Sequence, residues 1–154
     1  MKIILDTGVL GQLILNNPLN PYQQLKQHLR EGDYEGYLLN PIIQECALHL
    51  ANDYPRDVSL SLIISIIHTY NLQLITPDLS LLNQAGRLKR RFPHLSSCDS
   101  LILTMGVQKS EKFSVHTTDG KMVQNLDQNM RNKLNYKIYN YDQDGKPFDK
   151  NYKV

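Results

Sequence analysis

The sequence has few cysteines, a small net charge and no hydrophobic run of membrane-spanning length. Its two cysteines, Cys46 and Cys98, provide no disulfide framework, and each is typical of a small buried side chain in a reducing compartment. The longest apolar run, at 58–67, is interrupted by serines and is far shorter than the roughly 20 residues that a bilayer-spanning helix needs. We therefore expect a cytoplasmic protein without membrane contacts.

The formal net charge is +2, which permits contact with nucleic acid but is far below that of a histone-like chain. The chain has 154 residues, of which 41% are hydrophobic and 21% charged, as in an ordinary soluble globular protein. A chain of this length buries enough surface to fold without disulfide or metal support. We predict one domain over residues 1–154, with a core at about 1–141 and a polar tail at 142–154.

Short apolar strands alternate with longer helices along the chain. The strands are predicted at 2–5, 37–39, 72–75, 113–116 and 136–141. The helices are predicted at 9–15, at 21–31, from Pro41, at 55–70, from Asp78 through the basic run 87–91, from Ser96, and briefly after Asp119. This alternation indicates an α/β fold with a parallel sheet flanked by helices. In such folds, ligands bind at the carboxyl ends of the strands.

The third and fourth predicted helices carry apolar side chains that indicate their buried faces. Asn40 and Pro41 have the residue types of an N-cap and a first helical position. The expected buried stripe of that helix comprises Ile43, Cys46, Ala47, Leu50 and Ala51. In the helix at 55–70, the expected buried residues are Val58, Leu62, Ile66 and their neighbours.

Two aspartates directly follow predicted strands. Asp6 comes after Ile3-Ile4-Leu5, and Asp119 lies at the end of the strand at 113–116. Both therefore fall on the edge of the sheet where ligands bind. Each also has a structural alternative, since an aspartate before a turn or helix accepts hydrogen bonds from backbone N–H groups. Taken alone, each residue suits either role equally.

Two further acids lie on predicted helices. Glu45 is out of phase with the apolar stripe of its helix, so its simplest role is on a solvated face beside His49, four residues on. Asp99 completes a Ser-x-x-Asp capping box with Ser96. Capping does not exclude ligand binding, because one carboxylate oxygen can accept from the helix N-terminus while the other faces a metal.

Together the four acids favour a metal site. Carboxylates that converge at a sheet edge repel one another, and a bound divalent cation removes that cost. An all-oxygen ligand set suits Mg²⁺ or Mn²⁺ rather than zinc. Such an ion lowers the pKa of a bound water and stabilises charge on a phosphate, and the sequence leaves open whether one ion binds or two.

Four short segments resemble the PIN-domain family, particularly the VapC-type toxins of bacterial toxin–antitoxin pairs. They are Ile4-Leu5-Asp6-Thr7, Pro41-Ile42-Ile43-Gln44-Glu45, Asp99-Ser100-Leu101-Ile102 and Thr117-Thr118-Asp119. They occur in the order of the family and at about its spacing, and they cover roughly residues 1–125. No segment is specific by itself, and the resemblance rests on the set.

The resemblance implies a three-layer α/β/α fold with a central parallel five-stranded sheet and a metal-dependent endoribonuclease activity. Asp6, Glu45, Asp99 and Asp119 would form the catalytic acidic quartet. Asp6 and Asp99 would be the main ligands of one or two Mg²⁺ or Mn²⁺ ions, with Glu45 and Asp119 completing the site directly or through water. Thr7 or Thr117 would support it by a hydrogen bond to a carboxylate or a bound water.

The resemblance also implies partners: an RNA substrate, an antitoxin protein and a second copy in a homodimer. Arg87, Lys89, Arg90 and Arg91 precede the Asp99 segment and are candidates for RNA phosphate contacts, although cations at a helix C-terminus also favour the helix dipole without a ligand. The tail carries tyrosines, including Tyr141 and Tyr152, that could add a strand or cover an edge.

Rival functions place other residues at these positions. A phosphatase of the haloacid-dehalogenase type needs Asp-x-Asp at the first strand, and position 8 here is Gly8. A response-regulator receiver needs an acidic pair near the first strand, which this chain lacks. The remaining alternative is a PIN-like binding module with little or no nuclease activity. Four intact acids argue against it, because a non-catalytic protein has no reason to keep a repulsive cluster.

Overall fold

The computed structural model describes residues 1–108 and 110–139. Five strands form one sheet in the order β3-β2-β1-β4-β5, and every neighbouring pair is parallel. The strands are β1 (Lys2–Leu5), β2 (Glu35–Leu39), β3 (Gln73–Ile75), β4 (Ser114–Thr117) and β5 (Asn135–Ile138). The predicted α/β fold with a central parallel five-stranded sheet is confirmed.

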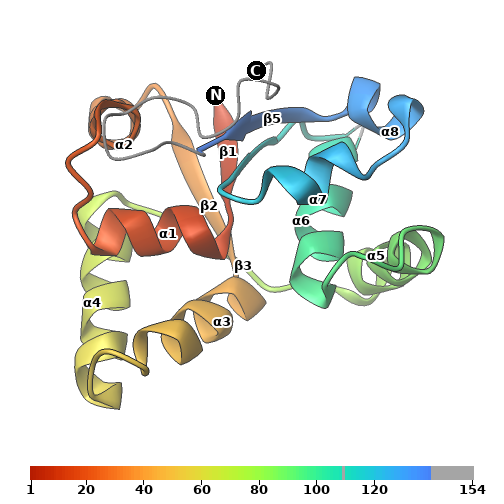
Figure 1. Cartoon of the computed structure of the whole chain (residues 1–154). Coiled ribbons are helices and arrows are strands. Elements are labelled where there is room, and N and C mark those ends of the chain that lie inside the picture. Colours follow the sequence, from red (N-terminus) through yellow and green to blue (C-terminus); the bar gives the residue numbers. More distant parts are fainter. Residues whose placement is uncertain (109, 140–154) are drawn as a thin grey trace.

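Helices cover both faces of the sheet. They are α1 (Thr7–Ile14), α2 (Asn20–Glu31), α3 (Asn40–Leu50), α4 (Arg56–Thr69), α5 (Leu79–Arg91), α6 (Ser97–Val107), α7 (Gly120–Gln124) and α8 (Gln128–Lys133). In Figure 1, α1, α2 and α4 lie on the left of the central strands, and α5, α6 and α8 lie on the right. The helices from the first half of the chain therefore form one outer layer and those from the second half form the other.

Side-chain caps and one glycine set the ends of several helices, as the sequence predicts. Asp78 caps α5 by accepting from the backbone N–H of Leu81 at 2.8 Å. Gly32 ends α2 with φ at 80°, a left-handed conformation that glycine adopts without strain. Ser96 and Asp99 form the predicted capping box at the start of α6.

The centre of the sheet is almost completely shielded from solvent. Ile3, Ile4 and Leu5 on β1 are fully buried, as expected for a middle strand that is covered on both faces. His116 on β4 is 1% exposed, and its Nδ1 lies 2.9 Å from the hydroxyl of Tyr139. Burial lowers the pKa of His116 to about 3, so the imidazole is neutral at physiological pH. His116 therefore belongs to the core and not to the acidic edge.

The buried faces of α3 and α4 differ from the predicted ones. On α3, Ile43 and Ala47 are only half-buried and Ala51 is exposed, whereas Ile42 is fully buried. On α4, Val58 is 42% exposed, and the buried residues are Ser59 and Ile63. The physical reason is that the apolar residues of α4 are spread around the helix among three serines, so hydrophobic periodicity does not identify the face that packs against α1 and α3.

Smaller differences concern the ends of elements. Leu39 is the N-cap of α3, and the side chain of Asn40 donates to the Thr76 hydroxyl at 2.7 Å instead of capping. Helix α8 was not predicted. Residues 140–141 of the predicted last strand, including Tyr141, lie outside the described residues, as do the tail at 142–154 and Tyr152. Within the described ranges, no helix has both the length and the apolar character to cross a membrane.

Two helix glycines provide a test of the packing between α6 and the sheet. A Cβ at Gly106 would lie 2.5 Å from Leu134 Cδ1 and 2.7 Å from Val115 Cγ2, and both neighbours are buried. We expect Gly106→Ala to lower the free energy of unfolding by about 1–3 kcal/mol through overpacking. A Cβ at Gly86 would meet no described atom within 4 Å, so Gly86→Ala should raise the free energy of unfolding by up to about 1 kcal/mol. Urea denaturation measures both, and equal effects would contradict the close approach of α6.

Candidate active site

The four predicted acids meet at the carboxyl edge of the sheet. Asp6 follows β1, and Asp119 lies two residues beyond the adjacent β4. Glu45 lies on α3, which follows β2, and Asp99 lies in the first turn of α6. All four line a single groove with a volume of about 360 Å³. The arrangement predicted from strand order and helix starts is therefore present in the structure.

Asp6 is the most deeply buried of these acids, with 7% of its surface exposed. Its Oδ1 accepts from the backbone N–H of Thr7 at 2.7 Å, and its Oδ2 accepts from the Thr117 hydroxyl at 2.6 Å. Burial raises the pKa of Asp6 to about 6; the charges of Asp99 and Glu45 raise it further, and the two hydrogen bonds oppose the shift. Part of the Asp6 population is therefore protonated near neutral pH unless a positive charge is close.

Glu45 is fixed to the start of α1. Its Oε2 accepts from the hydroxyl of Thr7 at 2.7 Å, while the backbone N–H of the same threonine donates to Asp6. The thiol of Cys98 also lies close to Glu45, and burial together with the neighbouring acids raises the pKa of this thiol to about 12. Cys98 is therefore an uncharged neighbour of the acids. It was predicted to be simply buried and is in fact half-buried beside the groove.

Asp99 and Asp119 each use one carboxylate oxygen for structure. Asp99 Oδ2 accepts from the backbone N–H of Ser96 at 2.9 Å. Asp119 Oδ1 accepts from the backbone N–H groups of Lys121 and Met122 at 3.0 and 3.2 Å. Among the described residues, no donor contacts Asp99 Oδ1 or Asp119 Oδ2. The capping alternative is thus correct for both aspartates, and each still has an oxygen available for a ligand.

Thr117 connects two of the acids. Its hydroxyl donates to Asp6 and accepts from the backbone N–H of Asp119 at 2.9 Å. The residue is fully buried at the end of β4, so neither hydrogen bond competes with solvent. Thr7 and Thr117, the two predicted supporting residues, therefore donate to the carboxylates of Asp6 and Glu45, and Thr117 also holds the backbone of Asp119.

The side chains of the groove suit a hard divalent cation. The acids provide only oxygen ligands, and a cation beside Asp6 would remove the cost of its buried charge. Three ligand atoms of the quartet do not come within 4.8 Å of one another in the described structure. In this arrangement an ion would contact at most two of these carboxylates directly, and the others would act through water ligands, which Mg²⁺ commonly keeps.

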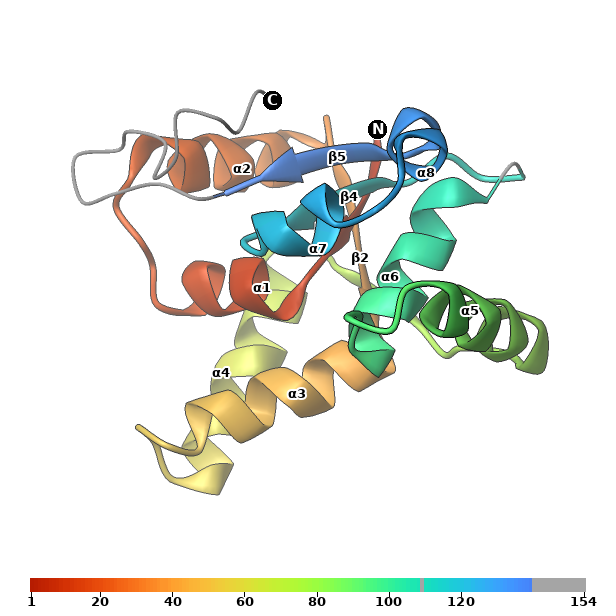
Figure 2. The same cartoon turned by 45° about the vertical axis from the view of Figure 1, so that its right-hand side comes forward.

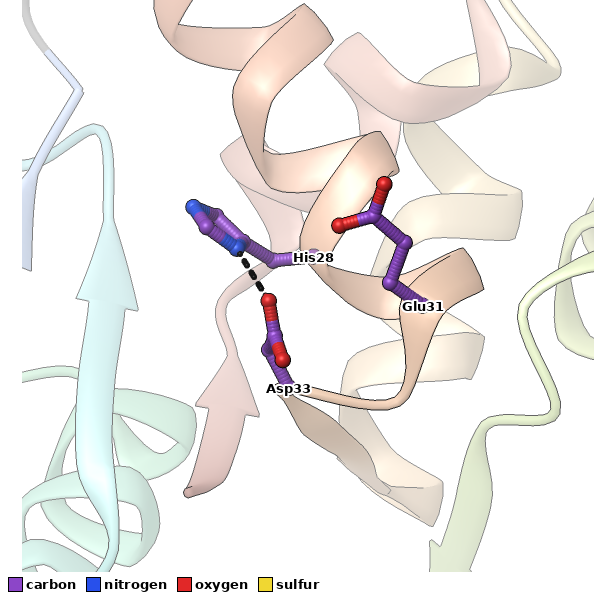
Figure 3. Close-up of side chains that lie close together, drawn as sticks. All are labelled: His28, Glu31 and Asp33. Atoms are coloured by element: carbon purple, nitrogen blue, oxygen red, sulfur yellow. Dashed lines mark hydrogen bonds and ion pairs between the residues drawn. The ribbon is translucent and has the colours of Figure 1, made fainter.

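Another group of described side chains does bring three ligand atoms within 4.8 Å of one another. This group lies at the opposite edge of the sheet. It comprises His28, Glu31 and Asp33, at the end of α2 and just after it (Figure 3). His28 Nδ1 is 3.0 Å from Asp33 Oδ2, and both side chains are well exposed to solvent. The carbonyl of Asp33 accepts from the amino group of Met1, which places this group at the amino ends of the strands. It is separate from the acidic groove.

Close packing at Gly8 sets the position of α1. A Cβ at Gly8 would lie 1.9 Å from the Thr118 hydroxyl oxygen, so only glycine allows the start of α1 to approach the end of β4 this closely. The same groove continues past the acids to Gln12, His49 and Asp53, none of which was predicted as a site residue. The available signal was the helical repeat, because His49 and Asp53 follow Glu45 at intervals of four.

The basic residues at the end of α5 do not line the acidic groove. Arg87, Lys89, Arg90 and Arg91 are all exposed. Lys89 Nζ is 3.3 Å from the hydroxyl of Ser97, and Arg91 forms an ion pair with Asp127. Because α5 packs against α6, the helix that carries Asp99, these cations flank the site without entering it.

Comparisons with known proteins identify the fold. No protein-family model matches the sequence, and no curated protein matches it. The chain is similar to one in the crystal structure of VapBC2 from Rickettsia felis bound to a DNA fragment from their promoter, with a TM-score of 0.69 over 90% of this chain and 99% of that chain. The fold is PIN-like. The sequence identity is 13%, so this similarity establishes the fold alone.

The PIN-like fold agrees with the resemblance in the sequence. The three-layer architecture with a parallel five-stranded sheet is as that resemblance implied. The four segments that carried the resemblance contribute the four acids that line the groove. The chemistry of the groove must be argued from these side chains, since the comparison adds only the fold.

The raised pKa of Asp6 predicts a stability that depends on pH. Because the folded-state pKa is about 6 and the ordinary value is 3.8, the folded chain loses stability as pH rises between these values. We expect Asp6→Asn, which removes the charge, to raise the free energy of unfolding at pH 7.5 by about 1–3 kcal/mol in EDTA. The gain should shrink at pH 4. Urea denaturation measures the free energy of unfolding of both chains, with Asp57→Asn as the control. If Asp6→Asn and the unmodified chain are equally stable at pH 7.5 and at pH 4, the prediction is wrong.

The Thr117 hydroxyl can be tested separately. Thr117→Val preserves the shape of the side chain but leaves the Asp119 N–H and Asp6 Oδ2 without this partner. We expect it to lower the free energy of unfolding by about 1–3 kcal/mol. Thr117→Ser keeps the hydroxyl and should recover most of the hydrogen-bond contribution. If the valine and serine variants unfold at the same urea concentration, the hydroxyl does not connect the two acids.

Proposed function

We propose that this chain is a metal-dependent endoribonuclease, and that it is the toxin of a VapBC-type toxin–antitoxin pair in the cytoplasm. The observation that carries the proposal is the convergence of Asp6, Glu45, Asp99 and Asp119 on one groove at the carboxyl edge of a PIN-like sheet. Such a cluster costs stability, as the raised pKa of Asp6 indicates. Clusters of acids with raised pKa values are typical of functional sites, where the chemistry requires them despite the loss of stability.

The acids have distinct tasks in the proposed site. Asp6 and Asp99 would hold one or two Mg²⁺ or Mn²⁺ ions, and Glu45 and Asp119 would complete the site directly or through water. A bound ion of this kind lowers the pKa of water and stabilises charge on a phosphodiester group. Thr7 orients Glu45, and Thr117 keeps Asp6 and Asp119 in register through two hydrogen bonds. Caps at α6 and α7 hold Asp99 and Asp119 rigidly.

RNA is the proposed substrate because cations flank the acidic groove. Acids alone repel a polyanion, so a strand needs basic contacts beside the site. Lys89 contacts Ser97, two residues before Asp99, and Arg87 and Arg90 are exposed on the same helix. We assign these residues and Arg91 to phosphate contacts outside the catalytic groove.

The surface of α3 and α4 supports a protein partner. A groove of about 640 Å³ runs between these helices and is lined by Ile43, Ala47, Leu48 and Leu60, among others. Leu48 is 66% exposed, and Ile64 on α4 is 52% exposed. Apolar surface of this extent suits an antitoxin or a second copy of the chain. The structural neighbour is itself described as VapBC2 bound to promoter DNA.

The activity is tested by cleavage of single-stranded RNA with Mn²⁺. We expect Asp6→Asn and Asp99→Asn to lower the rate at least about 100-fold, because each removes a proposed ligand of the ion. EDTA should abolish cleavage by the unmodified chain. Asp57→Asn, an exposed acid on α4, should retain full activity, and circular dichroism should show that all variants are folded.

The same experiment separates the alternative function. Full activity of either variant, or cleavage in EDTA, would refute a metal-dependent nuclease at this site. Binding of RNA or protein without cleavage by the unmodified chain would favour a PIN-like binding module instead.

A further inference from the structure

The acidic groove extends well beyond the four carboxylates. Helix α1 contributes Thr7, Gly8, Gly11 and Gln12 to its lining, and Leu15 follows at the end of that helix. Helix α3 contributes Glu45, Cys46, His49 and Leu50, and Asp53 follows. The two sets share one spacing, since each has residues at i, i+1, i+4, i+5 and i+8. Each helix therefore presents one continuous face to the groove.

The two faces start together at the acids and run outward. The hydrogen bond from Thr7 to Glu45 joins the inner ends of the two rows at 2.7 Å. Figure 2 shows α1 above α3, with the start of α6 beside their inner ends. Beyond this bond lie Gln12 and Leu15 from α1, and His49 and Asp53 from α3. We name these four residues, together with Gly11 and Leu50, the outer groove.

Gly11 indicates that the outer groove is kept open. Glycine inside a helix costs up to about 1 kcal/mol relative to alanine. A Cβ at Gly11 would meet nothing within 4 Å, so packing within the described chain does not require glycine there. The missing side chain leaves free space in the wall of the groove, directly beyond the acids. Gly86 on α5 is equally free of packing contacts, so it is the position of Gly11 in the groove lining that makes this space available to a ligand.

The chemistry of the outer groove suits a nucleobase better than a phosphate. Asp53 adds a fifth carboxylate to the lining, and His49 is the only basic side chain among the described residues that line the groove. The exposed Leu15 provides apolar surface, whereas Leu50 beside His49 belongs to the buried core. The imidazole ring of His49 can stack on a base. A phosphate would be repelled here, whereas a flat base would cover the apolar surface.

Polar groups of the outer groove can also contact the edge of a base. Gln12 Oε1 accepts from the Asn17 side chain at 2.7 Å, which leaves the Gln12 amide N–H groups as donors. No acceptor contacts this amide nitrogen within the described ranges. The Asp53 carboxylate is an acceptor, which suits a base with an exocyclic amino group. Uracil lacks this group and offers the carboxylate only its N3–H, so we expect it to be the least favoured base.

We propose that the outer groove is a base-binding subsite, which holds one unstacked nucleobase of single-stranded RNA next to the phosphate at the acids. His49, Gln12 and Asp53 are then specificity-determining residues, and Gly11 provides the space for the base. This proposal rests on the proposed ribonuclease function. It adds a preference for the base next to the cut, namely for bases that carry an amino group.

Two matched pairs of variants test the subsite. Gly11→Leu fills the outer groove, and Gly86→Leu is its control, because Gly86 is also a helix glycine with nothing within 4 Å of its Cβ. His49→Ala removes the ring, and His68→Ala removes another exposed helical histidine outside the groove. Thermal unfolding shows whether each variant is folded. Since the Gly11 Cβ position is open, Gly11→Leu should remain folded.

The first measurement is binding of a fluorescein-labelled single-stranded RNA of mixed sequence, followed by anisotropy in EDTA. We expect Gly11→Leu and His49→Ala to raise Kd roughly tenfold, the effect of losing one stacked base. Gly86→Leu and His68→Ala should change it less than about twofold. Because no cleavage is needed, this result stands even if the nuclease proposal fails. Unchanged Kd values in both groove variants, or no RNA binding by the unmodified chain, would overturn the subsite.

The second measurement is sequencing of the ends cut from a random single-stranded RNA with Mn²⁺. The unmodified chain should disfavour uracil at one position beside the cut, and Asp53→Ala should remove this bias. Gly11→Leu should raise KM far more than it lowers kcat. A bias that persists in both variants would overturn the subsite. Cleavage that survives Asp99→Asn would instead refute the nuclease proposal, so the two failures are distinguishable.

Discussion

The position of the Asp6 carboxylate is the constraint on which the rest of the site depends. It lies at the end of the central strand β1, next to β4, where the sheet is dry. A charge in such a place is stable only with partners, and the chain provides the Thr7 N–H and the Thr117 hydroxyl. These donors only partly offset burial, which keeps the pKa of Asp6 raised. A nearby cation is the arrangement that relieves the remaining cost.

The other acids combine structural and functional roles. Asp99 and Asp119 cap helices with one oxygen, and each has a second oxygen that no described donor contacts. Capping fixes the carboxylate relative to the backbone, so it positions a ligand oxygen more accurately than a free side chain would. The structural roles of Asp99 and Asp119 therefore support the proposed chemistry instead of competing with it.

The helices of the first half of the chain determine access to these acids. Close approach of Gly8 to Thr118 sets α1 against β4, and Thr7 connects α1 to Glu45 on α3. The groove lies between these two helices, and Gly8 and Gly11 are part of its lining. On its other side, α3 forms the apolar groove with α4. One helix thus separates the proposed substrate path from the proposed partner surface.

Local sequence determined the order of elements except α8, the caps of α5 and α6 and the identity of the four acids. These features depend on near neighbours, as the capping pair of Ser96 and Asp99 shows. The tertiary structure decided which face of α4 is buried, because the apolar residues of this helix are spread around it and mark no single face. It also decided that His116 belongs to the core and that His49 lines the groove. Both are histidines near acids in the sequence, and only the packing of α1, α3 and the sheet distinguishes them.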